Sequence, residues 1–140
     1  MRYALLILSM ALCGVVPLGC GGAQHGLVKP GPAVPGLNLS GRWYSPEFGE
    51  MKIVHAANNV SGKYADRRGP DHNGRFRGQL IGDLVRLEWI KPGNSIAAIM
   101  PRRGRAWLRV NRQGNRLSGK WGFDASESDG GLWNAERSTS

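Results

Sequence analysis

The sequence predicts an all-β protein whose folded part is a single eight-stranded antiparallel up-and-down meander barrel, with a two-sheet sandwich as the alternative. The main observation is a five-residue pattern, apolar–polar–glycine–polar–large apolar, found at 39–43, 60–64, 76–80 and 117–121. Strands bury alternate residues, so each glycine lies on the buried face, where it lets the strand curl and leaves space for an aromatic ring. The chain also contains 21 glycines and few long apolar periodic runs, which argues for many turns and against a helical bundle.

The start of the chain is typical of an export signal. Met1 and Arg2 form a short positive start, and residues 3–16 form an apolar run that is too short to span a bilayer comfortably. We therefore expect residues 1–19 to be a signal peptide.

The segment 17–22 resembles a bacterial lipobox, in which a small residue precedes a cysteine that becomes the lipidated N-terminus. Gly19 and Cys20 fit that pattern, whereas Pro17 and Leu18 depart from it. The resemblance implies a lipid anchor at Cys20 that holds the protein to a membrane of the bacterial cell envelope, at the outer membrane or a periplasmic face. The alternative is an ordinary secretory peptide cleaved after Ala23, which would give a soluble periplasmic or secreted protein.

Residues 20–37 are rich in glycine and proline and lack apolar groups that could pack. Such a segment forms neither a helix nor a central strand. We therefore expect a lipidated Cys20 followed by a disordered tether, and then a β-barrel domain over residues 38–140. A domain of roughly 100 residues can bury a core adequate for independent folding.

Eight short segments of the domain alternate between apolar and polar residues. They cover 39–45, 50–55, 60–64, 76–80, 85–89, 106–110, 117–123 and 133–135. Tight turns are expected at Asn58-Asn59, which tolerate positive φ, at Gly82-Asp83 and at 113–115. Because one face of every segment is apolar, a meander of these strands removes its edges most simply by closing into a barrel.

Three short motifs make the domain resemble the avidin–streptavidin barrels and, more loosely, the lipocalin-like barrels. Residues 41–44 resemble the opening Gly-x-Trp of avidins, 62–64 their third-strand Gly-Thr-Tyr, and 133–137 their last-strand Trp-Lys-Ala-Thr-Arg. The resemblance implies a barrel with a ligand inside, in which Tyr64 would bond the ureido oxygen of biotin. It also implies pocket walls from Trp89, Trp121 and Trp133.

The chain departs from the avidin pattern at other biotin-binding positions. Ser45 and Glu50, with an extra residue between, stand where avidins place an asparagine and then a serine. The aspartate that follows the last-strand tryptophan in avidins has no counterpart before Ser140. These departures argue against biotin itself as the ligand.

Seven large aromatic residues have inward parity: Trp43, Tyr64, Phe76, Trp89, Trp121, Phe123 and Trp133. An eight-stranded barrel is either filled by its own side chains or keeps space for one small ligand. The rings can therefore be core that fills the glycine gaps, or an aromatic-walled cup for a small hydrophobic or aromatic ligand, with Tyr64 as its polar handle. The candidate cavity residues are Trp43, Tyr64, Trp89, Trp121 and Trp133.

A second candidate site is a stripe of arginines around an outward tryptophan, made of Arg102, Arg103, Arg105, Trp107 and Arg109. Arginine beside an exposed aromatic ring can bind phosphate or aromatic groups, although single surface aromatics are common. An exported protein rarely meets nucleic acid, so anionic lipid or polysaccharide is the expected partner. The net charge of +9 agrees with this but can also reflect a GC-rich genome. The neighbouring apolar run 96–101 is expected to pack across a barrel end, or to touch a membrane or a partner.

We expect neither an enzyme nor a metal or cofactor site. The four residues Asp66, Asp71, His72 and Asn73 match no known metal cage, and no catalytic set has a recognisable context. The predicted function is non-catalytic binding of a small ligand by a lipid-anchored or secreted envelope protein. The alternative is a structural or interaction lipoprotein with a filled barrel, whose basic outer face contacts anionic envelope components.

Overall fold

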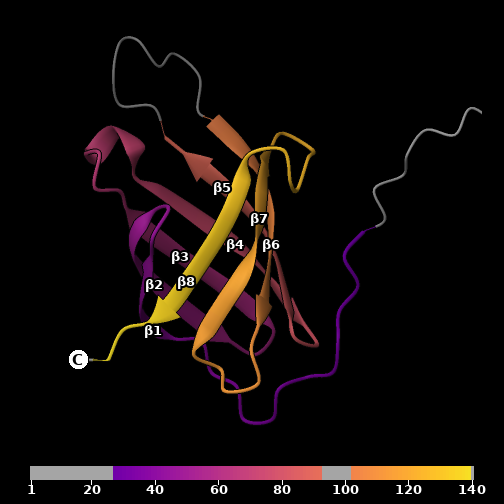
Figure 1. The fold of residues 1–140 in the computed structure, drawn as a ribbon. Helices are drawn as coiled ribbons and strands as arrows, with labels where there is room; N and C mark the ends of the chain where they lie inside the picture. The colour runs from indigo at the N-terminus through magenta and orange to yellow at the C-terminus, as the bar shows by residue number, and fades with distance from the viewer. Residues whose placement is uncertain (1–26, 93–101, 140) are drawn as a thin grey trace, which may run out of the picture.

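The computed structural model describes residues 27–92 and 102–139, which form one closed barrel (Figure 1). Each of the eight strands in this part of the chain pairs antiparallel with its sequence neighbours, and the last pairs with the first. The predicted up-and-down meander barrel is confirmed, and the two-sheet sandwich is excluded. The elements are β1 (Gly41–Ser45), β2 (Gly49–Ala56), β3 (Asn59–Ala65), the 3₁₀ turn η1 (Pro70–His72), β4 (Gly74–Ile81), β5 (Leu84–Lys91), β6 (Arg102–Val110), β7 (Arg116–Phe123) and β8 (Gly131–Arg137).

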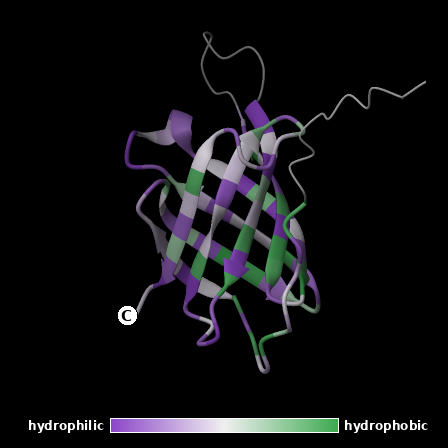
Figure 2. Cartoon of the chain, turned by 45° about the vertical axis from the view of Figure 1, so that its right-hand side comes forward, coloured by the Kyte–Doolittle hydropathy of each residue, from purple (hydrophilic) through white to green (hydrophobic). Residues whose placement is uncertain are grey.

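Apolar and polar residues alternate along the strands, as the chequered colouring of Figure 2 shows. Cross-strand register keeps inward residues opposite one another, for example Met51 opposite Tyr64. The buried cluster inside the barrel contains Leu39, Trp43, Phe48, Met51, Ile53, Val60, Tyr64, Phe76, Val85, Leu87, Trp89, Ala106, Leu108, Val110, Leu117, Trp133 and Ala135. The predicted in/out phase of the strands is therefore confirmed for the body of the barrel.

Inward glycines let neighbouring strands and rings approach closely. A Cβ atom built on Gly119 would lie 2.8 Å from the carbonyl carbon of Trp107 and closer still to its oxygen. A Cβ atom on Gly104 would lie 2.7 Å from the indole ring of Trp89. The expected space for a ring is thus present, and at Gly119 the absence of a side chain permits close approach of the neighbouring main chain.

The chain that leads into β1 runs past one end of the barrel, at the bottom in Figure 1. Buried side chains close this end. Leu39 and Trp43 are both 0% exposed there, and the indole nitrogen of Trp43 donates to the carbonyl oxygen of Leu39 at 2.8 Å. The guanidinium of Arg137 lies 4.6 Å from the centre of the Trp43 ring and donates to the Ser40 carbonyl at 2.9 Å.

The described part of the predicted tether, residues 27–37, is bonded to the β4–β5 turn. Asp83 in that turn accepts a hydrogen bond from the Gly31 amide at 2.6 Å and forms an ion pair with Arg109 at 2.7 Å. Arg109 also donates to the Lys29 carbonyl at 2.8 Å. The sequence predicts disorder over residues 20–37 because apolar groups that could pack are lacking. Residues 27–37 are held instead by hydrogen bonds between their main chain and the Asp83–Arg109 ion pair, and such bonds do not require apolar groups. Cys20 lies outside the described residues.

The tight turns follow the expected positions with one shift. Gly82-Asp83 joins β4 to β5, and Gly82 has a φ of 60°, which glycine adopts without strain. The β2–β3 turn is Ala57-Asn58, not Asn58-Asn59, because Ala57 takes the positive φ of 53° and Asn59 already pairs with Ala56. Among the described residues, no helix is long and apolar enough to cross a membrane.

Candidate functional site

The opposite end of the barrel holds a pocket of about 240 Å³, here called the open-end pocket. It is lined by residues from the ends of β3, β5 and β7 and the start of β6. Its lining residues are Phe48, Tyr64, Arg68, His72, Trp89, Lys91, Arg102, Trp121, Phe123 and Trp133. A cavity of roughly 150 Å³ is enough to bind benzene, so this pocket has room for an aromatic ring with a substituent.

The wall of the open-end pocket is built from aromatic rings that contact one another. Phe48, which follows β1 in a short turn, is central to this wall. Its ring centre lies 5.3 Å from that of Tyr64, 5.7 Å from Trp121 and 4.8 Å from Trp133. Trp89 packs edge-on against Trp121 at 5.6 Å. Edge-to-face contacts at these distances are favourable, so the rings hold each other in place without a ligand.

Trp133 has an unsatisfied hydrogen-bond donor. Its side chain is 1% exposed, and within the described part of the chain its indole nitrogen has no acceptor. The indole nitrogen of Trp89, in contrast, donates to the Gly122 carbonyl at 3.0 Å. A buried donor left without a partner costs about 1–3 kcal/mol, and such groups are rare. Trp133 thus contributes to the wall of the open-end pocket, while its buried donor has no acceptor among the described residues.

Cationic side chains surround the mouth of the open-end pocket. Lys91 Nζ lies 5.9 Å from the ring centres of both Phe48 and Tyr64. Burial lowers the pKa of Lys91, and the charges of Arg68 and Arg102 lower it further, while Asp66 opposes them. Lys91 is therefore a cation that gains from the arrival of an anion.

Arg68 already has a counter-ion. Its Nε and Nη2 atoms donate to the Asp66 carboxylate at 3.0 and 2.7 Å. These hydrogen bonds from Arg68 lower the pKa of Asp66 to about 2. The described lining residues include no Asp or Glu, so Lys91 and Arg102 give the mouth a positive charge.

Tyr64 sits at the end of β3 with its ring over Gly74. A Cβ atom on Gly74 would lie 2.8 Å from the Tyr64 Cε1 atom and closer to its hydroxyl, so only glycine leaves this space. Burial raises the pKa of Tyr64, and the nearby charge of Asp66 adds to the effect. The hydroxyl therefore stays neutral at physiological pH.

Four of the five predicted cavity residues, Tyr64, Trp89, Trp121 and Trp133, line the open-end pocket. Trp43 instead lies at the closed end. Phe123 was expected to be inward but is 43% exposed, because it lies at the end of β7, on the rim of the pocket.

Phe48, Arg68 and Lys91 were not identified from the sequence, since two of them come from loops and the third from a strand end. A large apolar residue in the short turn 46–48 was the available signal for Phe48.

The predicted arginine stripe divides between the two faces of β6. Alternation places Arg102 on the pocket rim and directs Arg103, Arg105, Trp107 and Arg109 outward. Trp107 is half-buried, between Arg86 on β5 and Lys120 on β7. Arg109 is already bound to Asp83. The stripe is therefore not one continuous site.

The loop before β4 is held by its own hydrogen bonds. The Asn73 side-chain oxygen accepts from the Asp66 amide at 2.8 Å, and Asp66 also pairs with Arg68. Over residues 27–92 and 102–139, no three His, Cys, Asp or Glu side chains gather as metal ligands would. The predicted packing segment 96–101 lies outside the described residues.

Comparison with known proteins finds no matching family model, no matching curated protein and no matching solved structure.

Proposed function

We propose that the protein is a non-catalytic binding protein whose open-end pocket takes one small aromatic or apolar molecule that carries a carboxylate. The observation that carries the proposal is the wall of contacting aromatic rings beneath a mouth that holds Lys91 and Arg102. The wall accepts an apolar body, and the cations accept the charge. Four positions that the avidin resemblance assigns to a ligand, Tyr64, Trp89, Trp121 and Trp133, belong to the same pocket.

The charge of Lys91 favours an anion over a neutral molecule. A desolvated ammonium loses hydration that its surroundings only partly replace, which is why its pKa is lowered. A carboxylate beside it would restore that interaction, and a hydrogen bond to a charged group contributes about 1.5–3 kcal/mol. Binding of the carboxylate would therefore raise the pKa of Lys91 and be accompanied by proton uptake at alkaline pH.

The test is calorimetric titration with 3-phenylpropionate and its neutral amide, 3-phenylpropanamide, which share a ring and differ in charge. We expect the carboxylate to bind more tightly than the amide by roughly tenfold, equivalent to about 1.4 kcal/mol. Lys91→Met should remove this preference, and Trp133→Phe, which replaces an indole of the wall by a smaller ring, should weaken binding of both probes. Lys120→Met, exposed on β7 and outside the pocket, is the matched control.

Two outcomes would refute the pocket proposal. One is the absence of binding by either probe. The other is a preference for the carboxylate that survives Lys91→Met. The first would favour the filled-barrel interpretation, in which the rings serve only as core; the second would show that the carboxylate is bound away from Lys91.

We also propose that Cys20 is lipidated and anchors the protein in the bacterial cell envelope, on the strength of the lipobox resemblance. Metabolic labelling with an acyl donor should mark the wild-type protein, and Cys20→Ala should move it to the soluble fraction. A mature N-terminus at Gln24 without lipid would instead establish the secretory alternative.

A further inference from the structure

The outer face of the barrel carries five cations in one cross-strand register, here called the basic row: Arg42, Lys52, Lys63, Arg75 and Arg103. Arg42 on β1 faces Lys52 on β2, Lys52 faces Lys63 on β3, and Lys63 faces Arg75 on β4. Ile90 on β5 then separates Arg75 from Arg103 on β6. The row crosses five strand spacings of about 4.8 Å, so it extends roughly 24 Å around the barrel.

The cations of the basic row repel one another and have no acidic partners. All five are exposed, and in the described residues none lies within 4.0 Å of a carboxylate, whereas Arg68, Arg86, Arg109 and Arg116 all do. Like charges directly opposite each other destabilise a sheet. Three consecutive pairs of this kind are therefore a cost to the fold, which an anion bound along the row would reverse.

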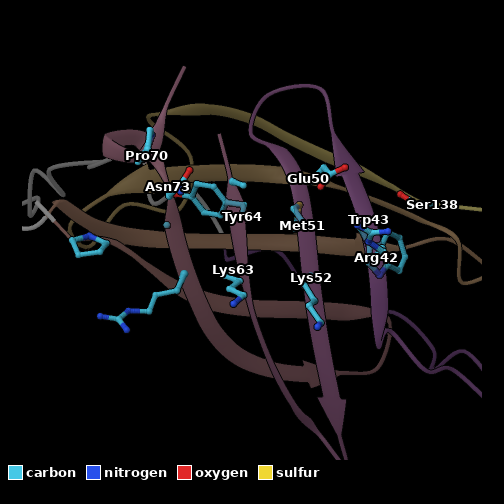
Figure 3. Close-up of a pocket in the computed structure, with 14 residues that line it drawn as sticks. Arg42, Trp43, Glu50, Met51, Lys52, Lys63, Tyr64, Pro70, Asn73 and Ser138 are labelled. Carbon is cyan, nitrogen blue, oxygen red and sulfur yellow. The ribbon is translucent and has the colours of Figure 1, made fainter. Parts of the chain in front are cut away.

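The long side chains of the basic row border two adjoining grooves. Figure 3 shows Lys52 and Lys63 leaving neighbouring strands on the same side, with Arg42 beside them. The first groove is lined by residues that include Arg42, Lys52, Lys63 and Arg75. The second shares the last three of these residues and adds Arg77, Arg103 and Arg105. Cations outnumber carboxylates in both linings, since the first contains one carboxylate, Glu50, and the second contains Glu88 and Asp124. A chain-like ligand can thus follow the row from one groove into the next.

The shape and composition of this face favour one class of polyanion. The row follows the convex curve of six strands, so a flat bilayer would meet only part of it, whereas a flexible chain can contact all of it. Single-stranded nucleic acid needs aromatic side chains on which bases stack. The aromatic residues that line the two grooves are buried core residues, 4% exposed or less: Trp43, Tyr64, Phe76 and Trp89. Tyr44, beside Arg42, lies under the Arg67 guanidinium at 5.0 Å, and the half-buried Trp107 belongs to a different register.

We propose that the basic row binds a linear acidic polysaccharide, carboxylated or sulfated, that lies across β1 to β6. Arginine forks and lysine ammonium groups both suit carboxylate and sulfate oxygens. The binding uses side chains on the outside of the barrel and is independent of the open-end pocket.

The test compares two triple variants of the full chain that remove the same charge. The row variant is Lys52→Gln, Lys63→Gln and Arg75→Gln; the control variant is Arg112→Gln, Arg116→Gln and Lys120→Gln, all exposed and away from the row. Affinity is measured for alginate, which is carboxylated, and heparin, which is sulfated, at low and physiological salt. A twenty-nucleotide oligothymidylate and phosphatidylglycerol vesicles are measured in parallel.

We expect the row variant to lose roughly tenfold or more in affinity for alginate, heparin or both, because three exposed charge contacts are removed together. The control variant should lose about twofold or less, and the wild-type affinity should fall as salt rises. The row variant should melt no earlier than wild type, since its substitutions relieve repulsion. Equal losses of affinity in both variants would show that binding depends only on net charge, and would overturn the proposal. Tighter binding of oligothymidylate or of vesicles than of either polysaccharide would overturn it too.

Discussion

Replacing Gly119 by alanine adds a single methyl group at a point where β6 and β7 approach closely. The new Cβ atom would lie 2.8 Å from the carbonyl carbon of Trp107 and 3.0 Å from the Leu108 Cα atom, and would overlap the Trp107 carbonyl oxygen. All three obstacles are main chain, so no side-chain rotation relieves them. The two strands must separate locally.

The cost of this separation has two parts. Overpacking a well-packed core costs about 1–3 kcal/mol. Each backbone hydrogen bond that opens in the buried ladder leaves a group unsatisfied, at about 1–3 kcal/mol more. Alanine recovers roughly 0.5–1 kcal/mol of strand propensity relative to glycine. We therefore expect Gly119→Ala to lower the free energy of unfolding by about 3 kcal/mol, a large part of the 5–15 kcal/mol typical of a domain.

Urea unfolding followed by tryptophan fluorescence and by circular dichroism measures this loss. The control is Ser118→Ala, one residue earlier, where the side chain is exposed and a change of under about 0.5 kcal/mol is expected. If Gly119→Ala were no more destabilising than Ser118→Ala, the inference that this glycine permits close strand approach would be wrong.

Three further predictions concern charged groups. Because the pKa of Asp66 is lowered to about 2, its ion pair should stabilise the fold above pH 4 and be lost between about pH 4 and 2; Asp66→Asn should flatten this part of a plot of urea midpoint against pH. The pKa of Lys91 in the folded protein is lowered below its unfolded value of 10.5. Between the folded and the unfolded pKa the unfolded state holds more protons, so the free energy of unfolding should rise with pH; in Lys91→Met that rise should be absent. Asp83→Asn should free the N-terminal segment and accelerate hydrogen exchange at the Gly31 amide, measured by NMR, while Asp124→Asn, at an exposed position, should leave it unchanged.

Much of the fold can be predicted from short stretches of the sequence. The in/out alternation of a strand depends only on the two-residue period of its side chains, so Ile53, Leu108 and Leu117 could be assigned to the core without knowledge of their neighbours. The inward glycines carried a second local signal, since glycine beside an aromatic residue on one strand face predicts curvature. Together these patterns were sufficient to predict the barrel.

The two ends of the barrel could not be distinguished in this way. Trp43 and Trp133 are both inward tryptophans near glycine, but Trp43 closes one end and Trp133 lines the open-end pocket at the other. The difference depends on where along its strand each residue lies once the sheet has closed. That position depends on the register of every strand pair around the barrel.

The composition of both proposed sites was decided by strand pairing. Arg42, Lys52, Lys63 and Arg75 are ten or more residues apart in the chain, and each looks like an ordinary solvated charge on a polar strand face. Antiparallel pairing with one particular register brings them opposite one another. Arg102 and Arg103 are adjacent in the chain, but the same pairing sends one to the pocket rim and the other to the outer face, because successive side chains of a strand point to opposite sides.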